Sequence, residues 1–115
     1  MYALRNKVQL IGNLGADPEI KTLDGGKKMA RFNMATNESY NNSKGEKVTE
    51  TQWHQVVAWG KAAELTEKLL FKGSEVAIEG KLVNRVYNNK EGEKKYITEV
   101  QLNEMLLLGD KKKES

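Results

Sequence analysis

Cysteine is absent from this sequence, proline and histidine occur once each, and no long run of apolar residues is present. Without cysteine the chain has neither a disulfide framework nor a thiolate metal site, and we expect it to work in a reducing compartment. No apolar run approaches the roughly 18 residues of a membrane-spanning helix, and the N-terminus lacks the apolar core of a signal peptide. These absences predict a soluble, cytoplasmic protein with no membrane partner.

The single histidine, His54, also narrows the chemistry. Nucleophilic and metal catalysis need several cooperating side chains, which a lone histidine does not supply. Asp17, Glu19 and Asp24 gather acidic charge around the only proline, but their spacing matches no calcium loop, so we interpret them as solvated turn residues. We therefore expect no catalytic residue, metal or cofactor, and a structural or subunit-interface role for His54.

Charge is only mildly one-sided. The 115 residues include 19 lysines and arginines against 16 aspartates and glutamates, which gives a formal net charge of +3. A chain of this length supports one domain with a real hydrophobic core. The small positive excess favours a polyanionic partner.

Five segments alternate apolar and polar residues with the period of two that half-buried strands show. They are residues 8–14, 31–37, 49–59, 76–82 and 96–107. Gly12 and Gly80 interrupt the first and the fourth segment, where a β-bulge would bend the strand. Turn chemistry occupies residues 15–18 and 23–26, a flexible loop 41–46, and a long hairpin tip 88–93.

One helix is predicted between the third and the fourth strand. Ala62, Leu65, Thr66 and Leu69 recur at helical spacing, and Lys72-Gly73 is a plausible stop. Five short strands around one core favour an all-β fold with this single helix, a closed five-stranded oligonucleotide-binding (OB) barrel that the helix plugs. An SH3-like barrel and a five-stranded sandwich are alternatives, but the position of the helix argues against both.

Residues 52–60 carry both tryptophans of the chain. With a side-chain period of two, Trp53 and Trp59 share one face of the strand, while Val56 and Ala58 point to the other. The two indoles would lie about 20 Å apart along the strand, where they could stack on well-separated bases of one extended nucleic-acid strand. The alternative is that both belong to the core, since tryptophan is highly buried on average.

Aromatic and basic residues recur together in the same region. The candidate stacking residues are Tyr40, Trp53, Trp59 and Tyr87, and the cations near them include Lys44, Lys61, Lys81 and Arg85. On the fourth strand Lys81, Arg85 and Tyr87 have the parity opposite to the apolar residues, so they share the face that the core does not use. Aromatic faces for bases and cations for phosphates are typical of sequence-tolerant single-strand binding. Duplex readers usually present a base-reading helix instead.

Several motifs occur in the order and spacing of one family. They are NKVQLIGNLGADPE (6–19), ATNESY (35–40), WHQVV (53–57), GKAAE (60–64), KGS (72–74) and IEGKL (78–82). From residue 6 to about residue 102 the chain resembles the bacterial single-stranded DNA-binding proteins. The resemblance implies an OB fold, a homotetramer, base stacking on Tyr40, Trp53, Trp59 and Tyr87, and cationic DNA contacts at Lys61, Lys72 and Arg85.

The resemblance also has departures. Relatives often carry tryptophan at the positions of Tyr40 and Tyr87 and phenylalanine at that of Trp59, and these exchanges keep the stacking capacity. Val86 stands where a relative has lysine, so one phosphate contact is expected to be missing. Family members usually continue into a flexible tail with an acidic end that recruits other proteins. This sequence ends in a short, net basic segment, so we do not expect tail-dependent partners.

The sequence therefore predicts an OB domain over residues 1–108, followed by a short basic end at 109–115. We expect it to bind single-stranded DNA with little sequence preference and to protect it in replication, recombination and repair on the nucleoid. A primosome accessory protein or an RNA binder is the alternative within the same class. An OB-type nuclease would need an arginine and carboxylates around a metal. Ile11 and residues 105–108 are interpreted as subunit contacts.

Overall fold

Residues 5–109 are the part of the chain that the computed structural model describes, and they are mostly β-structure. The elements are β1 (Val8–Leu14), β2 (Glu19–Thr22), a 3₁₀ turn (Asp24–Gly26), β3 (Lys28–Asn41), β4 (Lys47–Trp59), α1 (Lys61–Leu69), β5 (Glu75–Asn88) and β6 (Lys94–Leu107). Within these residues no helix combines the length and the apolar character needed to cross a bilayer. The predicted basic end lies, from residue 110 onward, outside the described residues.

The prediction of five strands with the helix after the third is wrong by one strand. Residues 19–22, which lie between the two predicted turns, form β2, which pairs antiparallel with β3 from Glu19↔Arg31 to Thr22↔Lys28. The helix α1 therefore follows the fourth strand. Only one residue of β2, Ile20, packs against the core. Because Ile20 lies between charged Glu19 and Lys21 and the strand has only four residues, the sequence shows no alternation from which β2 could be predicted.

Five of the strands close into a barrel, in the ring order β1-β5-β6-β4-β3 and back to β1. Two of the strand pairings in this ring involve only two residue pairs each. Strands β4 and β6 run parallel and pair only at Val56↔Val100 and Val57↔Gln101. Strands β1 and β3 pair at Asn13↔Ala35 and Leu14↔Met34. A single closed ring agrees with the predicted barrel and excludes the two-sheet sandwich.

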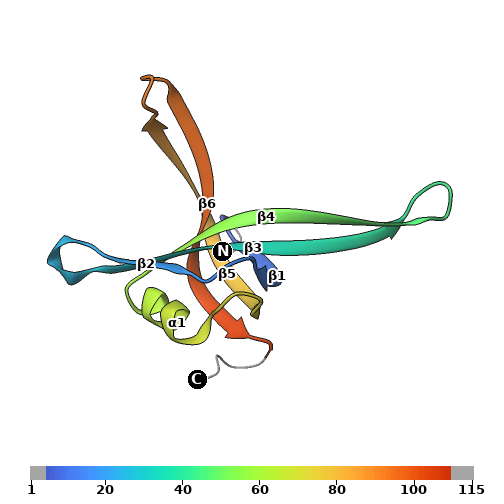
Figure 1. Cartoon of the computed structure of the whole chain (residues 1–115), viewed down its shortest axis with the longest axis horizontal. Coiled ribbons are helices and arrows are strands. Elements are labelled where there is room, and N and C mark those ends of the chain that lie inside the picture. The colour runs from blue at the N-terminus through green and yellow to red at the C-terminus, as the bar shows by residue number, and fades with distance from the viewer. Residues whose placement is uncertain (1–4, 110–115) are drawn as a thin grey trace.

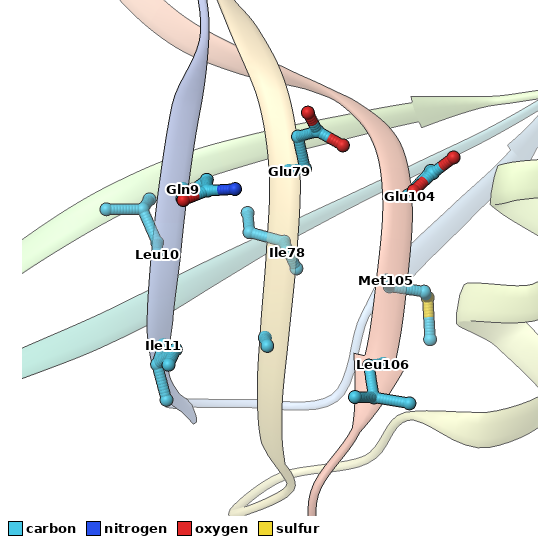
Figure 2. Close-up of a pocket in the computed structure, with 9 residues that line it drawn as sticks. Gln9, Leu10, Ile11, Ile78, Glu79, Glu104, Met105 and Leu106 are labelled. Carbon is cyan, nitrogen blue, oxygen red and sulfur yellow. The ribbon is translucent and has the colours of Figure 1, made fainter.

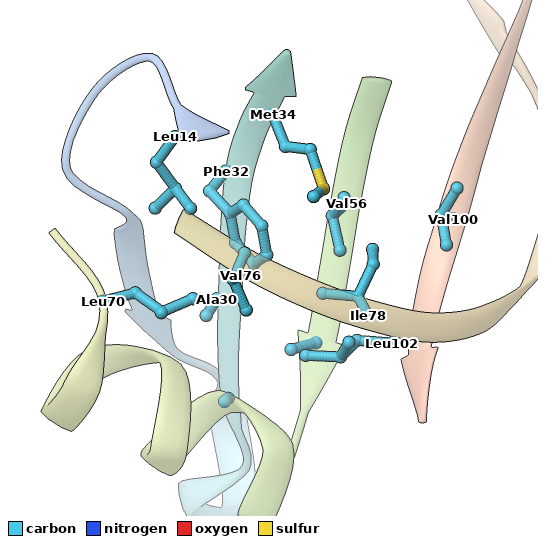
Figure 3. Packing of buried hydrophobic residues seen from close by; sticks show 12 residues of the cluster. Leu14, Ala30, Phe32, Met34, Val56, Leu70, Val76, Ile78, Val100 and Leu102 are labelled. Carbon is cyan, nitrogen blue, oxygen red and sulfur yellow. The ribbon is translucent and has the colours of Figure 1, made fainter. Parts of the chain in front are cut away.

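The core fills the barrel and is closed at one end by the helix (Figure 3). Its largest members are Leu14, Phe32, Met34, Val56, Leu70, Val76, Ile78, Val100 and Leu102. Leu70, at the end of α1, points toward the strands, and Ala63 of α1 is fully buried. Because Val56 and Ala58 of β4 face this core, the residues that alternate with them must face outward.

Two hairpins extend beyond the barrel as arms that point in different directions (Figure 1). The β3–β4 arm ends at residues 42–46 and the β5–β6 arm at residues 89–93. Both tips have the same hydrogen bonds: the side-chain oxygen of Asn42 accepts from the backbone N–H groups of Lys44 and Glu46, and that of Asn89 does the same two and four residues on. The arms are thus ordered ribbons with capped tips.

Gly12 and Gly80 both allow close approach of backbones, but only Gly80 lies at a bulge. The pairing of β5 with β6 shifts between Glu79 and Gly80, as predicted. The pairing of β1 with β5 continues through Gly12 without a shift, so the predicted bulge there is wrong. A Cβ atom on Gly12 would lie 2.0 Å from the carbonyl oxygen of Ala35, which makes glycine necessary where β1 meets β3.

We predict that Gly12→Ala destabilises the fold by about 1–3 kcal/mol, the usual cost of overpacking, because the backbone of β3 would have to move away from β1. The free energy of unfolding, measured by urea denaturation, checks this. Gly109→Ala is the matched control, since a Cβ there has ordinary contacts, the nearest at 3.7 Å from Glu75. Equal stability of the two variants would contradict the role assigned to Gly12.

Candidate nucleic-acid interface

The solvent side of β3, β4, β6 and β5 forms one continuous surface, which we call the outer face. Residues opposite each other in paired strands share a side, so the pairs Arg31↔Val57, Val57↔Gln101 and Gln101↔Lys81 carry one face from β3 to β5. The other prominent side chains of this face are Trp53, Trp59, Val83, Arg85, Tyr87 and Glu99. The barrel therefore brings together the strand that carries both tryptophans and the one that carries Lys81, Arg85 and Tyr87.

Trp53 is outside the core, with 62% of its surface exposed. Its ring lies against Gly15 in the loop after β1, where a Cβ atom would be 2.6 Å from Cζ3 of the indole. Asp17 of the same loop is hydrogen-bonded to the segment between α1 and β5, because the backbone N–H of Lys72 donates to its Oδ1 at 2.8 Å. Trp53 is thus an exposed aromatic ring that packs on Gly15. The predicted cation Lys72 lies in the segment that is hydrogen-bonded to the same loop.

Trp59 is half-buried at the other end of the same face. Nζ of Lys27 lies 4.9 Å from the centroid of its ring, a cation–π distance. Trp59 also lines a hollow of about 280 Å³ together with Arg31, Arg85 and Glu99. Lys27 was not among the predicted cations, since it lies in a turn that nothing in the sequence connects to β4.

A charged cluster occupies this hollow. Arg85 donates from Nε to Oε1 of Glu99 at 2.8 Å and from Nη2 to Oε2 at 3.0 Å, and Nη2 of Arg31 is 3.8 Å from the same Oε2. Glu99 is only 5% exposed. Its hydrogen bond and its charge raise the pKa of Arg85. Arg85 was predicted from the sequence, but Arg31 and Glu99 were not, because their proximity to it depends on the pairing of β3 with β4, of β4 with β6 and of β5 with β6.

Tyr40 does not lie on the outer face. It pairs with Val48, and these two residues have the parity of the core residues, so Tyr40 and Trp53 are on opposite sides of the β3–β4 arm. The Tyr40 hydroxyl donates to Oε1 of Glu50 at 3.1 Å. Lys44 lies farther out, in the tip of this arm. The structure therefore gives the four predicted stacking residues two locations instead of one.

Lys61 and Leu82 also lie elsewhere than the sequence pattern predicts, since Lys61 does not line the hollow beside Trp59 and Leu82 is not in the core. Lys61 begins α1 and lines a separate hollow with Leu65 and residues 102–105, beside the second half of β6. Leu82 has core parity but is exposed, because it lies beyond Gly80, the last residue of β5 that pairs with β1. Lys81, opposite Gln101, lies on the outer face as predicted from its parity.

A cleft of about 400 Å³ opens where β4 and β6 separate into the two arms. It is lined by Trp53, His54 and Gln55 from β4 and by Leu82 and residues 97–100. His54 is half-buried there, with Nε2 2.9 Å from the hydroxyl of Thr36. This bond joins β4 to β3 and fits a structural histidine.

Two of the three acidic residues around the proline have protein partners, and Glu19 is the first residue of β2, so its prediction as a turn residue is wrong. Asp17 accepts from the backbone of Lys72, and Oε1 of Glu19 lies 3.7 Å from Nζ of Lys21. Among residues 5–109 no three histidine, cysteine or acidic side chains come close enough together to hold an ion. The outer face offers aromatic rings, guanidinium groups and amines, which suit binding of an anionic, base-bearing polymer.

Comparison with known proteins places this geometry in a family. The model of the single-strand binding protein family matches residues 5–108. Single-stranded DNA-binding protein 1 of Chlorobaculum tepidum is 45% identical over 107 residues, which cover 92% of this chain and 66% of the relative. The protein of the same name from Xylella fastidiosa is 43% identical and 79% covered. The Neisseria meningitidis single-stranded DNA-binding protein is 37% identical and 63% covered, so this chain spans somewhat less than two thirds of some relatives.

Solved structures agree with the fold. A Plasmodium falciparum SSB in complex with ssDNA superposes with a TM-score of 0.83 and 35% identity, covering 90% of this chain and 95% of that one. A deletion mutant of the single-stranded DNA binding protein from Thermus aquaticus has a TM-score of 0.78 and 32% identity, with 90% of this chain and 50% of that chain covered.

We predict that Gly15→Ala displaces the Trp53 ring while the fold stays intact, because the backbone of Gly15 has no positive φ and accepts a side chain. In a Trp59→Phe background, which leaves one indole, the emission of Trp53 should shift to longer wavelength. Gly109→Ala in the same background is the control and should leave the spectrum unchanged. An unaltered spectrum in Gly15→Ala would show that Gly15 does not support the ring.

Proposed function

The chain belongs to the single-strand binding protein family, and from that premise we propose that its outer face binds single-stranded DNA with little sequence preference. The observation that carries the proposal is Trp53, a large exposed indole supported by Gly15 on a face that also holds cations. An indole left in water is unfavourable unless a partner covers it. The role is protection of single strands in replication, recombination and repair, in the cytoplasm on the nucleoid, and it involves binding without catalysis.

Stacking supplies the sequence tolerance. Every base has a π face, so Trp53, Trp59 and Tyr87 accept any base that reaches them, and each stack contributes about 1–3 kcal/mol. Tyr40, on the opposite side of the β3–β4 arm, serves a part of the strand that wraps around that arm. The separation of the rings over several strands favours an extended DNA path that crosses the barrel.

Lysines supply the second contribution. Lys81 lies on the outer face and Lys72 in the loop before β5, while Lys44 lies at the tip of one arm and Lys61 at the start of α1. In the part of the chain that the structure describes, none of these four ammonium groups lies at ion-pair distance from a carboxylate. They are therefore available for phosphates. The helix α1 buries Ala63 and Thr66 against the barrel, which speaks against reading of a duplex groove by this helix.

We further propose that the protein assembles as a homotetramer. Ile11 and Leu106 are 62% and 64% exposed, and they lie on either side of β5 on the outside of the barrel (Figure 2). A hollow of about 350 Å³ between them is lined by Ala77 as well as by Glu79 and Glu104. An apolar patch with a polar rim is typical of a subunit contact.

We predict that poly(dT) strongly quenches the tryptophan fluorescence, that duplex DNA does so weakly, and that Trp53→Ala lowers the free energy of poly(dT) binding by about 1–3 kcal/mol. A titration of both proteins with poly(dT), poly(U) and a duplex measures this. Circular dichroism controls for folding. Tight poly(dT) binding with unchanged emission would refute the stacking role of the indoles, and equal affinity for the duplex or for poly(U) would refute the preference for single-stranded DNA.

We predict a mass near four times 13.0 kDa by light scattering at micromolar concentration. Ile11→Lys should lower the mass, since it buries a charge in the apolar contact. Leu65→Lys is the matched control, because Leu65 is 46% exposed on α1 and lies outside this patch. A monomeric wild type would contradict the assembly, and an unchanged mass in Ile11→Lys would remove the Ile11 patch from it.

A further inference from the structure

The hollow beside Trp59 has a lining unlike that of a phosphate site. Its apolar surface comes from Met29, Val57 and Val83, and Trp59 stands at its edge. The charged groups in it are two guanidiniums and the carboxylate of Glu99, so the cluster carries one net positive charge. Phosphate sites normally gather unpaired positive charge and N–H donors. Here much of the positive charge is already offset from within the protein.

The geometry of Arg85 is fixed by Glu99. Both carboxylate oxygens accept from the Nε and Nη2 edge of the guanidinium, at 2.8 and 3.0 Å. Such a bidentate pair sets the plane of the guanidinium as well as its position. It also occupies one of the edges with which Arg85 would grip a phosphate, and a phosphate at the other edge would be repelled by the buried Glu99. The flat face of the Arg85 guanidinium is therefore the part that is left for contact with a ligand.

Arg31 lies along the wall of the same hollow. Its Nε is shielded from solvent and, within residues 5–109, makes no hydrogen bond. Its Nη2 is 3.8 Å from Oε2 of Glu99. The side chain is therefore partly buried in the wall of the hollow, with 33% of its surface exposed. The hollow thus combines an indole and two guanidiniums over an apolar floor, and planar groups of this kind stack on nucleic-acid bases.

We propose that this hollow is a nucleobase seat, in which one base of the bound strand stacks on the guanidinium of Arg85 next to Trp59, and that Glu99 is the positioning residue that holds Arg85 for it. This inference rests on the proposed function. It replaces the phosphate contact that the sequence assigned to Arg85 with a base contact. Because the bidentate edge is engaged with Glu99, the seat does not read guanine by hydrogen bonds and accepts any base.

Substitution of Arg85 separates a base contact from a phosphate contact. Arg85→Lys keeps the positive charge and removes the planar group. For a base seat, Arg85→Lys and Arg85→Ala should both weaken poly(dT) binding about 5- to 10-fold, near the lower end of the range for one stack, and leave the salt dependence unchanged. For a phosphate contact, Arg85→Lys should bind like the wild type, and Arg85→Ala should lower the slope of log affinity against log salt by about 0.7. That second pattern would overturn the proposal.

Lys72→Ala is the matched comparison, since a phosphate contact predicts for it the loss of slope that Arg85→Ala lacks. An abasic deoxyribose-phosphate oligomer adds a readout that bears directly on the base. A seat for a base predicts that wild type and Arg85→Ala bind the abasic oligomer equally. Equal weakening of Arg85→Ala toward the abasic oligomer and poly(dT) would refute the seat. If wild type itself fails to bind poly(dT), the proposed function is wrong, which is a different result.

Glu99→Gln tests the positioning role. Glutamine keeps the size of the side chain but cannot accept both hydrogen bonds from Arg85. We expect Glu99→Gln to weaken poly(dT) binding about fivefold, and to have no further effect when combined with Arg85→Ala, as a shared function requires. Circular dichroism confirms that the variants fold. Tighter binding of Glu99→Gln with a steeper salt slope would mean that Glu99 only restrains a phosphate-binding arginine, and would contradict the inference.

Discussion

Closure of five strands into one ring is the constraint on which the rest of the structure depends. In a closed barrel every side chain along a strand points either into the core or away from it, with no edge at which this rule relaxes. The ring is completed at two short contacts, and one of them exists only because Gly12 lets β1 approach Ala35. Because Val56 and Val100 pair with their side chains in the core, Trp53, Trp59 and Glu99, which have the opposite parity, must point away from it. The outer face, to which we propose that DNA binds, is therefore a consequence of how the core is packed.

The same closure explains why the outer face combines groups from distant parts of the sequence. Strands β4 and β6 separate beyond their two paired positions, which produces the cleft and the two arms. Trp53 at the cleft is supported by a loop after β1, and Arg85 on one arm is fixed by Glu99 of the neighbouring strand. The positive character of the face is uneven as a result. Within residues 5–109, Lys81 places an unpaired amine on this face, while the hollow beside Trp59 holds a cluster with only one net positive charge next to aromatic and apolar surface.

Much of this arrangement follows from local patterns. The period of two predicted that Trp53 and Trp59 share the face opposite Val56 and Ala58 and that Lys81, Arg85 and Tyr87 share a face, because parity within one strand needs no knowledge of its neighbours. Three features depend on pairing between strands and were missed. Tyr40 falls on the other side of its arm because it pairs with Val48, Glu99 reaches Arg85 through the register of β5 with β6, and β2 exists only because β3 begins early enough to pair with it. Gly15 was predicted only as a turn residue, because its contact with the Trp53 ring depends on the packing of the loop after β1 against β4.

We propose that single-stranded DNA lies on the outer face, across the ring from β3 to β5. Nuclear magnetic resonance of the labelled protein with a short oligo(dT) tests it most directly, because each tryptophan indole N–H and each arginine Nε–H gives its own signal. We expect large shifts for the indoles of Trp53 and Trp59 and for Nε–H of Arg85, and small shifts for the backbone of α1 and for Ile11. Shifts concentrated on α1 or around Ile11, with both indoles unmoved, would contradict it.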